Sequence, residues 1–409
     1  MKNAIRTQLC IMMFLEFFIW GAWFVTLGTF LGNNLKATDG EIALAFSTQS
    51  WGAIIAPFII GIIADRYFNA ERILGILHLL GAILMYFMYQ SNTFETFFIL
   101  VLAYMIVYMP TLALVNSVSF NQMTNPAKEF SMVRVFGTLG WIIAGLSISY
   151  FFHWDKGEFI TQGFLKNTFL MTAIASLVLG LFSFTLPKTP PRMVRSKNVA
   201  IKDILGLNSL RLFKDRNFLV FFLSSVLICI PLAFYYQNTN PFLVEIGMDN
   251  ATGKMTIGQI SEIVFMLLLP YFFTKFGFKK TILVAMGAWV LRYLLFAFGD
   301  VDELGFMLLV GIALHGICYD FFFVSGQIYT DSKAGEEYKS SAQGLITLAT
   351  YGVGMLIGFW VAGEISTWYL LKDGNHMWKY IWLYPAIFAL TVFVLFTFFF
   401  KTEKIDYQS

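Results

Sequence analysis

Long apolar segments separated by short polar stretches recur along the whole of this 409-residue chain. Each segment has about 20 residues or more, the length that a helix needs to cross the hydrocarbon core of a bilayer. Backbone polar groups find no water there, so such segments must fold as helices. Only 13% of the residues are charged, whereas a soluble domain averages about a quarter. The sequence therefore predicts an all-α polytopic membrane protein.

We expect about twelve transmembrane helices in two six-helix halves. The expected spans are 6–32, 41–64, 72–90, 95–122, 130–152, 165–186, 216–244, 255–275, 279–298, 304–330, 340–370 and 377–400. The basic start followed by an apolar run superficially resembles a signal peptide, but the run continues past Trp20 and Trp23. That is too long for a signal sequence, so we expect a retained first helix.

A polar segment divides the expected halves. It contains Pro187, Pro190 and Pro191 and several Lys and Arg residues. We expect an N-terminal half at 1–186, a cytoplasmic linker at 187–215 and a C-terminal half at 216–409, with Ile201–Leu212 as a short interfacial helix. The positive charge of the linker fits the positive-inside rule better than contact with lipid or nucleic acid.

The orientation follows from the distribution of Lys and Arg. They concentrate in the termini, in the linker and in the loops after the second, fourth, eighth and tenth spans. The remaining loops carry roughly one third as many cations and more acids, which predicts that both termini are cytoplasmic.

Two loops repeat between the halves. Gly61–Arg72 holds Asp65 directly before Arg66, and Pro270–Lys280 holds Thr274 directly before Lys275, each with further cations a few residues on. Six-helix parallel repeats are typical of the major facilitator fold. We expect Asp65, Arg66 and Arg72 to form a loop that gates conformational change.

The expected span 304–330 places Asp320 more than a dozen residues from either end. A carboxylate at that depth is costly and is usually functional. On a regular helix Gly316, Phe323 and Gln327 would share its face. Movement between a desolvated site and the neighbourhood of an Arg would change its affinity for a proton, which makes Asp320 the best proton carrier. A structural ion pair is the alternative.

Further polar residues within spans are candidates for ligand contact. Gln259 and Glu262 share a helix face and could hydrogen-bond a polar ligand, or could satisfy other helices. Thr138 and Trp141 continue the face of Arg134, although Arg134 is near enough to its helix end to extend to the surface. Glu16 is a counter-ion candidate for Arg134, as is Asp320. Glu16 and Glu262 are also lesser proton carriers.

Other intramembrane groups favour structural roles. We expect Arg292 and Glu364 to bind neighbouring helices, and His315 to be a hydrogen-bonded structural group that could titrate near neutral pH. His78 completes the ionisable set. Four aromatic residues could stack on a planar ligand or serve as packing: Trp20, Trp23, Tyr235 and Tyr236.

The sequence contains no pattern typical of an enzyme. It lacks a phosphate-binding glycine loop, metal-ligand spacing and a nucleophile beside a base. Cys10, Cys229 and Cys318 all fall inside expected spans, which predicts neither a disulfide framework nor a metal site. No cofactor is expected. Without a nucleotide-binding domain, the driving force for transport would be an ion gradient or the substrate's own gradient.

Six segments together resemble the bacterial nucleoside:proton symporters of the major facilitator superfamily. They are FLEFFIWGAWFVTLG (14–28), YMPTLALVNSVSF (108–120), RVFGTLGW (134–141), QISEIVFMLLLPYFF (259–273), WVLRYLLFAFGD (289–300) and SAQGL (341–345). The resemblance covers nearly the whole chain in order. It implies nucleoside uptake coupled to inward proton flow, in the bacterial inner membrane.

The resemblance also implies site residues. It implies ligand contact by Arg134, Thr138, Gln259, Glu262 and Asp320, with Asp320 tied to coupling. Trp141 and Tyr319 stand where the family has phenylalanines, which keeps an aromatic at each place. In the seventh span the family's Gln and Asn align with Ala233 and Tyr236, and Gln237, Asn238 and Asn240 lie just beyond. Glu16 stands where a Gln is expected.

Two alternatives remain open. The altered seventh span is compatible with proton-coupled symport of a sugar or other polar glycoside on the same fold. A non-transporting sensor or assembly partner is the second. In each case the bilayer is a partner, nucleic acid is not, and the chain is expected to function as a monomer.

Overall fold

The computed structural model describes residues 2–59, 68–124, 126–190 and 207–403. Within this part of the chain ten helices are long and apolar enough to cross a membrane, judged by length and composition. The chain divides into two compact units, which we describe separately. Unit 1 comprises Met1–Ala200 with Asp249–Thr256, and unit 2 comprises Ile201–Met248 with Ile257–Ser409.

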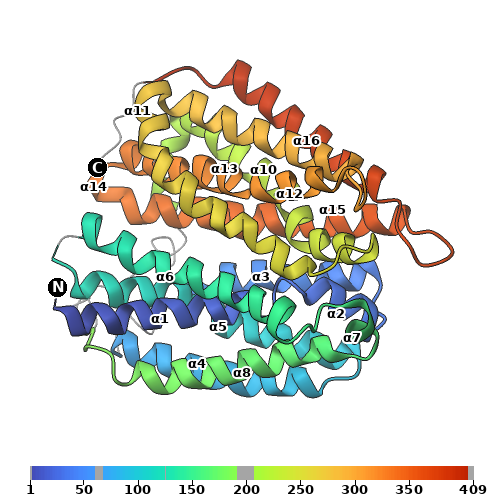
Figure 1. Ribbon diagram of the computed structural model, residues 1–409. Helices are drawn as coiled ribbons and strands as arrows, with labels where there is room; N and C mark the ends of the chain where they lie inside the picture. The colour runs from blue at the N-terminus through green and yellow to red at the C-terminus, as the bar shows by residue number, and fades with distance from the viewer. Residues whose placement is uncertain (1, 60–67, 125, 191–206, 404–409) are drawn as a thin grey trace. The chain divides into compact units, whose positions relative to one another are not determined.

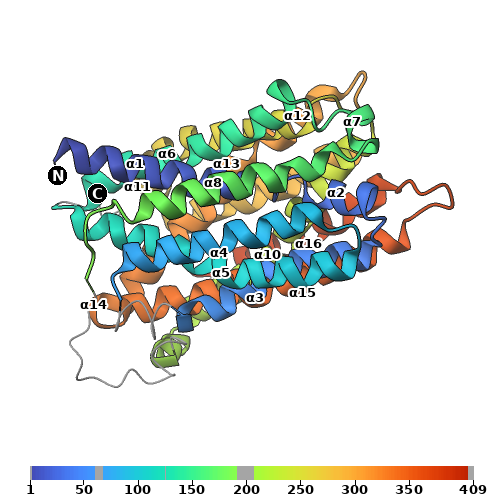
Figure 2. The same ribbon diagram turned by 90° about the horizontal axis from the view of Figure 1, so that it is seen from below.

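Unit 1 is built from helices, which Figure 1 shows in blue to green. Their bounds are α1 Asn3–Gly21, α2 Leu27–Asn34, α3 Asp39–Ile59, α4 Ala70–Gln90, α5 Phe94–Gln122, α6 Pro126–Leu146, η2 Ser147–Phe151, α7 Gly157–Thr161, η3 Phe164–Lys166 and α8 Asn167–Ser183. The chief pairs in contact are α1 with α6, α4 with α8, and α3 with α5. Figure 2 shows α4 and α8 side by side as well.

Close contact between α1 and α6 depends on small residues. A Cβ atom at Gly140 of α6 would lie 2.1 Å from the backbone oxygen of Phe14 in α1. One at Gly21 would lie 2.9 Å from Cγ of Trp141. Small residues allow membrane helices to approach to backbone contact. This approach sets the relative position of Glu16 on α1 and Arg134 on α6.

The first residues of α11 belong to unit 1. The backbone N–H of Thr252 donates to Oδ2 of Asp155 (3.0 Å), and that of Gly253 donates to Oγ of Ser149 (2.6 Å). Ser149 in turn donates to Asp155. These groups satisfy backbone donors that the first turn of a helix leaves without partners.

Unit 2 holds the remaining elements. They are η4 Leu207–Lys214, α10 Arg216–Glu245, α11 Ala251–Phe298, α12 Gly305–Ala313, α13 His315–Tyr319, η5 Asp320–Val324, α14 Ser325–Thr347, η6 Leu348–Gly354, α15 Met355–Trp368 and α16 Trp378–Phe399. Helix α10 packs against both α15 and α16. The only bridge between extended residues in the described chain joins Leu370 and His376.

The helices follow the expected spans closely, with three informative differences. The expected span 6–32 is divided into α1 and α2 by a turn after Gly21. The expected spans 255–275 and 279–298 are joined in α11, which is broken at Gly277 (φ 76°, ψ 169°). Glycine adopts this left-handed conformation without steric cost, so the chain can turn there. In the expected span 304–330, α12, α13, η5 and α14 follow one another.

Part of the expected linker can be described. Residues 207–212 of the expected interfacial helix lie in η4, a short 3₁₀ segment, while 201–206 lie outside the described residues. The linker role of 187–215 stays a prediction.

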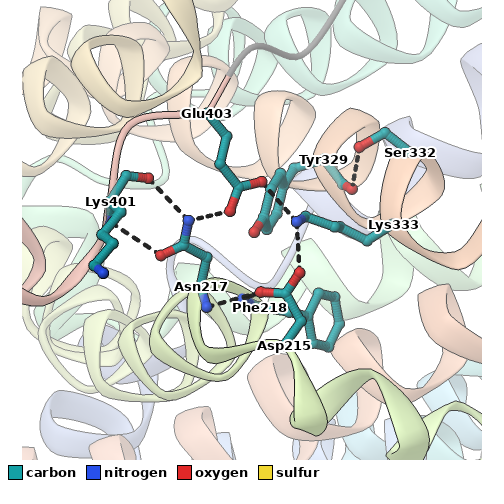
Figure 3. A network of polar contacts seen from close by, with 8 residues as sticks. All are labelled: Asp215, Asn217, Phe218, Tyr329, Ser332, Lys333, Lys401 and Glu403. Carbon is teal, nitrogen blue, oxygen red and sulfur yellow. Dashed lines mark hydrogen bonds and ion pairs between the residues drawn. The ribbon is translucent and has the colours of Figure 1, made fainter.

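A polar network fixes the C-terminal segment to unit 2 (Figure 3). Nζ of Lys333 lies 2.6 Å from a carboxylate oxygen of Asp215 and 2.6 Å from one of Glu403. The side chain of Asn217 donates to the carbonyl of Lys401 (2.9 Å) and to Glu403. Asp215 also caps α10 by accepting from backbone N–H groups. Because its charges are paired with one another, we infer that this network stabilises the fold.

Candidate functional site

In unit 1 the expected ligand contacts of α6 lie against α1. The guanidinium carbon of Arg134 lies 4.1 Å from the ring centroid of Phe17. The ring of Trp141 lies 5.6 Å from that of Trp20. Arg134, Thr138 and Trp141 share one face of α6 because they are four and seven residues apart. Each is half-buried, so this face is partly accessible. The group combines a cation, a hydroxyl and two indoles, which suits a planar ligand with polar edges.

Trp20 adds a buried donor to this group. Its Nε1 has no hydrogen-bond partner among the described residues. Its ring also packs edge-on against Tyr108 of α5 at 5.8 Å. Trp23 is different, because its fully buried ring packs on Tyr104 and Phe169 within the helix core. Of the two indoles of α1, Trp20 is the one available to a ligand.

Glu16 does not pair with Arg134, as the sequence allowed. Its Oε2 lies 2.8 Å from Nε2 of His78 on α4, and its Oε1 lies 2.6 Å from the hydroxyl of Thr111 on α5. The hydroxyl of Tyr108 donates to the backbone carbonyl of Glu16. The register of α1 explains the difference, since Glu16 faces α4 and α5 while its neighbour Phe17 meets α6.

In unit 2 the candidate acid Glu262 is paired with His315. Its Oε1 lies 2.9 Å from Nε2 of His315. The imidazole stacks on Tyr235 with ring centroids 4.9 Å apart, and the guanidinium carbon of Arg292 lies 4.2 Å from the same tyrosine ring. Arg292 also donates through Nε to the carbonyl of Gly311 (3.1 Å). His315 and Arg292 thus hold the aromatic and acidic groups in place.

The Glu262 side chain keeps partial access, with 18% of its area exposed, whereas His315 is 3% exposed. Nδ1 of His315 has no hydrogen-bond partner among the described residues. Gln259, one turn earlier on α11, is also half-buried. The carboxylate and amide can therefore still accept or donate hydrogen bonds to a ligand.

Asp320 opens η5, a π-helical turn, and is fully buried. π-turns inside helices are rare and often occur at functional sites. The turn changes the helical register between Asp320 and Gln327, and Gln327 is exposed while Asp320 is buried. Gly316 instead serves packing, because its Cβ would lie 2.5 Å from the backbone of Ser261.

Tyr319 precedes Asp320 and joins a tyrosine pair. Its hydroxyl lies 2.6 Å from that of Tyr351 in η6. Phe323 packs between them, with ring centroids 5.0 Å from Tyr319 and 5.9 Å from Tyr351. The sequence singled out Tyr319 but not Tyr351, because nothing in the spacing of residues 319 and 351 shows that two π-turns meet.

The seventh span packs closely against α15. A Cβ at Gly358 of α15 would lie 2.6 Å from Cβ of Ala233 on α10. Asn238 donates to Ser366 of α15 (3.1 Å) and thus joins two helices. Gln237 is buried, and its Oε1 has no hydrogen-bond partner among the described residues. Tyr236 is half-buried and packs edge-on against Tyr235.

Three further sequence expectations concern gating and structural residues. Asp65 and Arg66 lie outside the described residues, and Arg72 is exposed at the start of α4, so the gating role stays a prediction. Glu364 is exposed on α15. The described residues contain no group of three His, Cys, Asp or Glu side chains that could hold a metal ion.

Comparison with known proteins places this arrangement in a family. The family model described as "Nucleoside H+ symporter" matches residues 1–405. The chain is 42% identical to YegT of Escherichia coli K12 over 404 residues, covering 96% of this chain and 93% of YegT. It is 33% identical to the xanthosine permease of the same organism over 428 residues, covering 99% of each.

The solved structures agree. A crystal structure of the nucleoside transporter NupG is 30% identical, with a TM-score of 0.85, covering 98% of this chain and 100% of that one. The peptide-transporter-family protein PepTSo, at 14% identity and a TM-score of 0.75, shares the fold alone, covering 98% of each chain. The expected all-helical major facilitator fold is confirmed. The prediction that the protein is a transporter and not an enzyme is also confirmed. The chain belongs to the Nucleoside H+ symporter family of the major facilitator transporters.

Proposed function

We propose that this multi-pass membrane protein takes up nucleosides with protons across the bacterial inner membrane by alternating access. We further propose that it works as a monomer with both termini in the cytoplasm. Family membership supports the coupled transport. The Lys and Arg distribution supports the orientation.

One observation carries the site assignment: Glu262 is held by His315 at 2.9 Å and yet is partly exposed. The side chain of Glu262 is already held in place before a ligand binds. Hydrogen bonds that it accepts from ribose hydroxyls or a base N–H therefore cost little further side-chain entropy. We assign Gln259, Gln237, Tyr236 and Tyr319 as its companions in unit 2.

Unit 1 supplies a complementary set. Arg134 and Thr138 offer donors, and Trp141 with Trp20 offers indole faces for a planar base. We propose this set as the substrate contacts of unit 1, which can be tested within that unit.

Asp320 is the proposed proton carrier. It is fully buried at a π-turn in the middle of a membrane span. An ionised carboxylate is costly at that depth, so protonation and conformational change are linked. Glu262 is the second proposed carrier, because it is a partly exposed carboxylate that lies 2.9 Å from a ring nitrogen of His315.

Uptake of labelled uridine and adenosine into proteoliposomes tests the proposal. Competition by nucleosides, free bases, sugars and glycosides then identifies the cargo. Unlabelled nucleosides should compete and sugars should not. Glu262→Gln should weaken uptake, while Glu364→Gln, at an exposed glutamate of another helix, should leave it unchanged.

Competition by sugars or glycosides, with nucleosides inert, would replace the nucleoside assignment. Equal loss of uptake in both variants would show that Glu262 has no particular role.

A further inference from the structure

Four helices of unit 1 enclose a hydrogen-bonded cluster that the proposed function does not use. Glu16 comes from α1, His78 from α4, Thr111 from α5 and Ser176 from α8. All four side chains are buried, with exposed areas of 0 to 1%. An ionisable pair inside a membrane unit is expensive and more often serves function than packing.

The hydrogens of this cluster can be counted. The hydroxyl of Ser176 donates to the backbone carbonyl of His78 (3.0 Å). The same oxygen lies 3.2 Å from Nδ1 of His78. A hydroxyl has a single hydrogen, so when Ser176 donates to that carbonyl it can only accept from Nδ1, which then carries a proton.

The other ring nitrogen faces the carboxyl group. Nε2 of His78 and Oε2 of Glu16 lie 2.8 Å apart. With Nδ1 protonated, a second proton must lie between these two atoms, because otherwise two lone pairs would face each other. The pair is then an imidazolium beside a carboxylate, or a neutral imidazole beside a carboxylic acid. Either form holds one proton more than a neutral imidazole with a carboxylate.

Loss of that proton has a defined route within the same contacts. Nδ1 loses its proton. The imidazole keeps the proton on Nε2, which donates a hydrogen bond to Glu16, and the hydroxyl of Ser176 turns from the His78 carbonyl to Nδ1. The two forms thus differ by one proton and by the direction of one hydroxyl. No side chain has to leave its partner.

The cluster adjoins the proposed ligand contacts of unit 1. Phe17 follows Glu16 in the sequence, and the guanidinium of Arg134 lies over its ring. Trp20, one turn further along α1, packs against both Tyr108 and Trp141. Tyr108 donates to the carbonyl of Glu16.

The charged and titratable groups around the pair are few. Tyr104 and Tyr108 face it from α5, with both Glu16 and Arg134 in electrostatic range of Tyr108, and Arg134 lies on α6. Helix α8 contributes none, as its sequence contains no ionisable residue. Arg134 is therefore the cation that a change of charge at the pair would act on.

We propose that Glu16 and His78 form a further proton-binding site, within unit 1 and separate from Asp320 and Glu262. The inference rests on the proposed function for its role in transport, but the binding of a proton does not. A purely structural pair would keep the same protons at every pH at which the protein is folded.

Histidine ¹⁵N NMR of the detergent-solubilised full chain tests this directly. The chain has four histidines, so the spectrum is simple. His78→Gln identifies the His78 signals, and His153→Gln serves as the matched control. Titration from about pH 5 to about pH 9 spans the range in which a histidine pair exchanges protons. We expect Nδ1 of His78 to be protonated at the acid end and unprotonated at the alkaline end.

Glu16→Gln supplies the second variant. A glutamine amide can donate to Nε2, so Nδ1 stays protonated and the contacts of the cluster are kept. The variant should fold and lose the titration step of Nδ1. In proteoliposomes it should retain exchange of labelled uridine across the membrane, and should lose the corresponding step in the pH profile of gradient-driven uptake.

A constant protonation state of Nδ1 across the titration would overturn the proposal, as would an unaltered step in Glu16→Gln. Absence of uridine transport by the unsubstituted chain would refute the nucleoside assignment alone, because the NMR titration needs no substrate.

Discussion

Each unit contains one Glu–His pair in which both residues lie within helices, and the two pairs differ in what surrounds them. In unit 1 Glu16 and His78 lie 2.8 Å apart, and both imidazole nitrogens have partners. In unit 2 Glu262 and His315 lie 2.9 Å apart, but Nδ1 of His315 has none among the described residues and the carboxylate is partly exposed. The same two side chains therefore form a closed site in one unit and an accessible one in the other.

This difference separates two functions that composition alone cannot distinguish. A buried pair that is fully satisfied can hold a proton but cannot reach a ligand without breaking its contacts. A pair with open hydrogen-bonding capacity can contact a ligand at little cost. We therefore propose that the ligand contacts of unit 1 lie at the α1–α6 contact, away from its pair, and that those of unit 2 lie at the pair itself.

The largest expected contrast is in stability. Glu16→Ala leaves Nε2 of a buried histidine without its partner, and breaking such a pair costs about 3–5 kcal/mol. Glu262→Ala removes a partly exposed partner, whose place water can take, and should cost less, about 1–3 kcal/mol. Chemical unfolding in detergent measures both. Similar losses in the two variants would contradict the distinction between closed and accessible pairs.

One glycine at a close helix contact in each unit should give a smaller contrast. Gly140→Ala in unit 1 and Gly316→Ala in unit 2 each force a methyl group against backbone atoms, which costs about 1–3 kcal/mol. Gly316→Ala should also weaken uridine binding, because it separates α13, which holds His315, from α11, which holds Glu262.

Equilibrium binding of labelled uridine measures that second effect. Gly344→Ala is the matched control, since no atom lies within 4 Å of the added methyl group. Equal binding by all three variants would show that the spacing of α11 and α13 does not matter for the ligand.

The smallest expected effect is on the pH dependence of stability. It concerns one carboxylate near a helix start in each unit, Glu71 and Asp215. In unit 1, Glu71 accepts from the backbone N–H of Thr189, a hydrogen bond without a cation. In unit 2, burial opposes ionisation of Asp215, but hydrogen bonds from Lys333 and backbone N–H groups outweigh it and lower its pKa. Because the folded-state pKa is lowered, the stabilisation is present above the ordinary pKa of Asp, about 3.9. It is lost as pH falls through the folded-state value.

Thermal unfolding in detergent between about pH 6 and about pH 3 measures this loss. Lys333→Met should flatten the acid-side decline, and Lys254→Met, at a cation outside the network, should not. A decline of the same steepness in both variants would remove Asp215 from the account.

Much of the fold could be predicted from the sequence because lipid imposes one strong rule. A run of about 20 apolar residues must be a helix, so the bounds of α4, α5 and α10 fall within two residues of expectation. The break at Gly277 and the π-turn at Asp320 could not be predicted in this way. Both depend on local backbone conformation, which hydropathy does not record.

The candidate site was predictable only as a list of residues. The cost of burying charge singles out Glu16, Glu262 and Asp320 without showing their partners. His78 lies 62 residues from Glu16, and their contact depends on how α1 is rotated against α4. The presence of a histidine and an acid within expected spans nevertheless indicated that the two could pair.

Simultaneous measurement of nucleoside and proton movement in proteoliposomes tests the account most directly. Labelled uridine reports the cargo and a pH-sensitive dye inside the vesicles reports protons. We expect uridine to enter with protons, and we expect Asp320→Asn to abolish gradient-driven uptake while uridine binding persists. Uridine entry without proton movement, or proton-coupled entry unchanged in Asp320→Asn, would contradict the account.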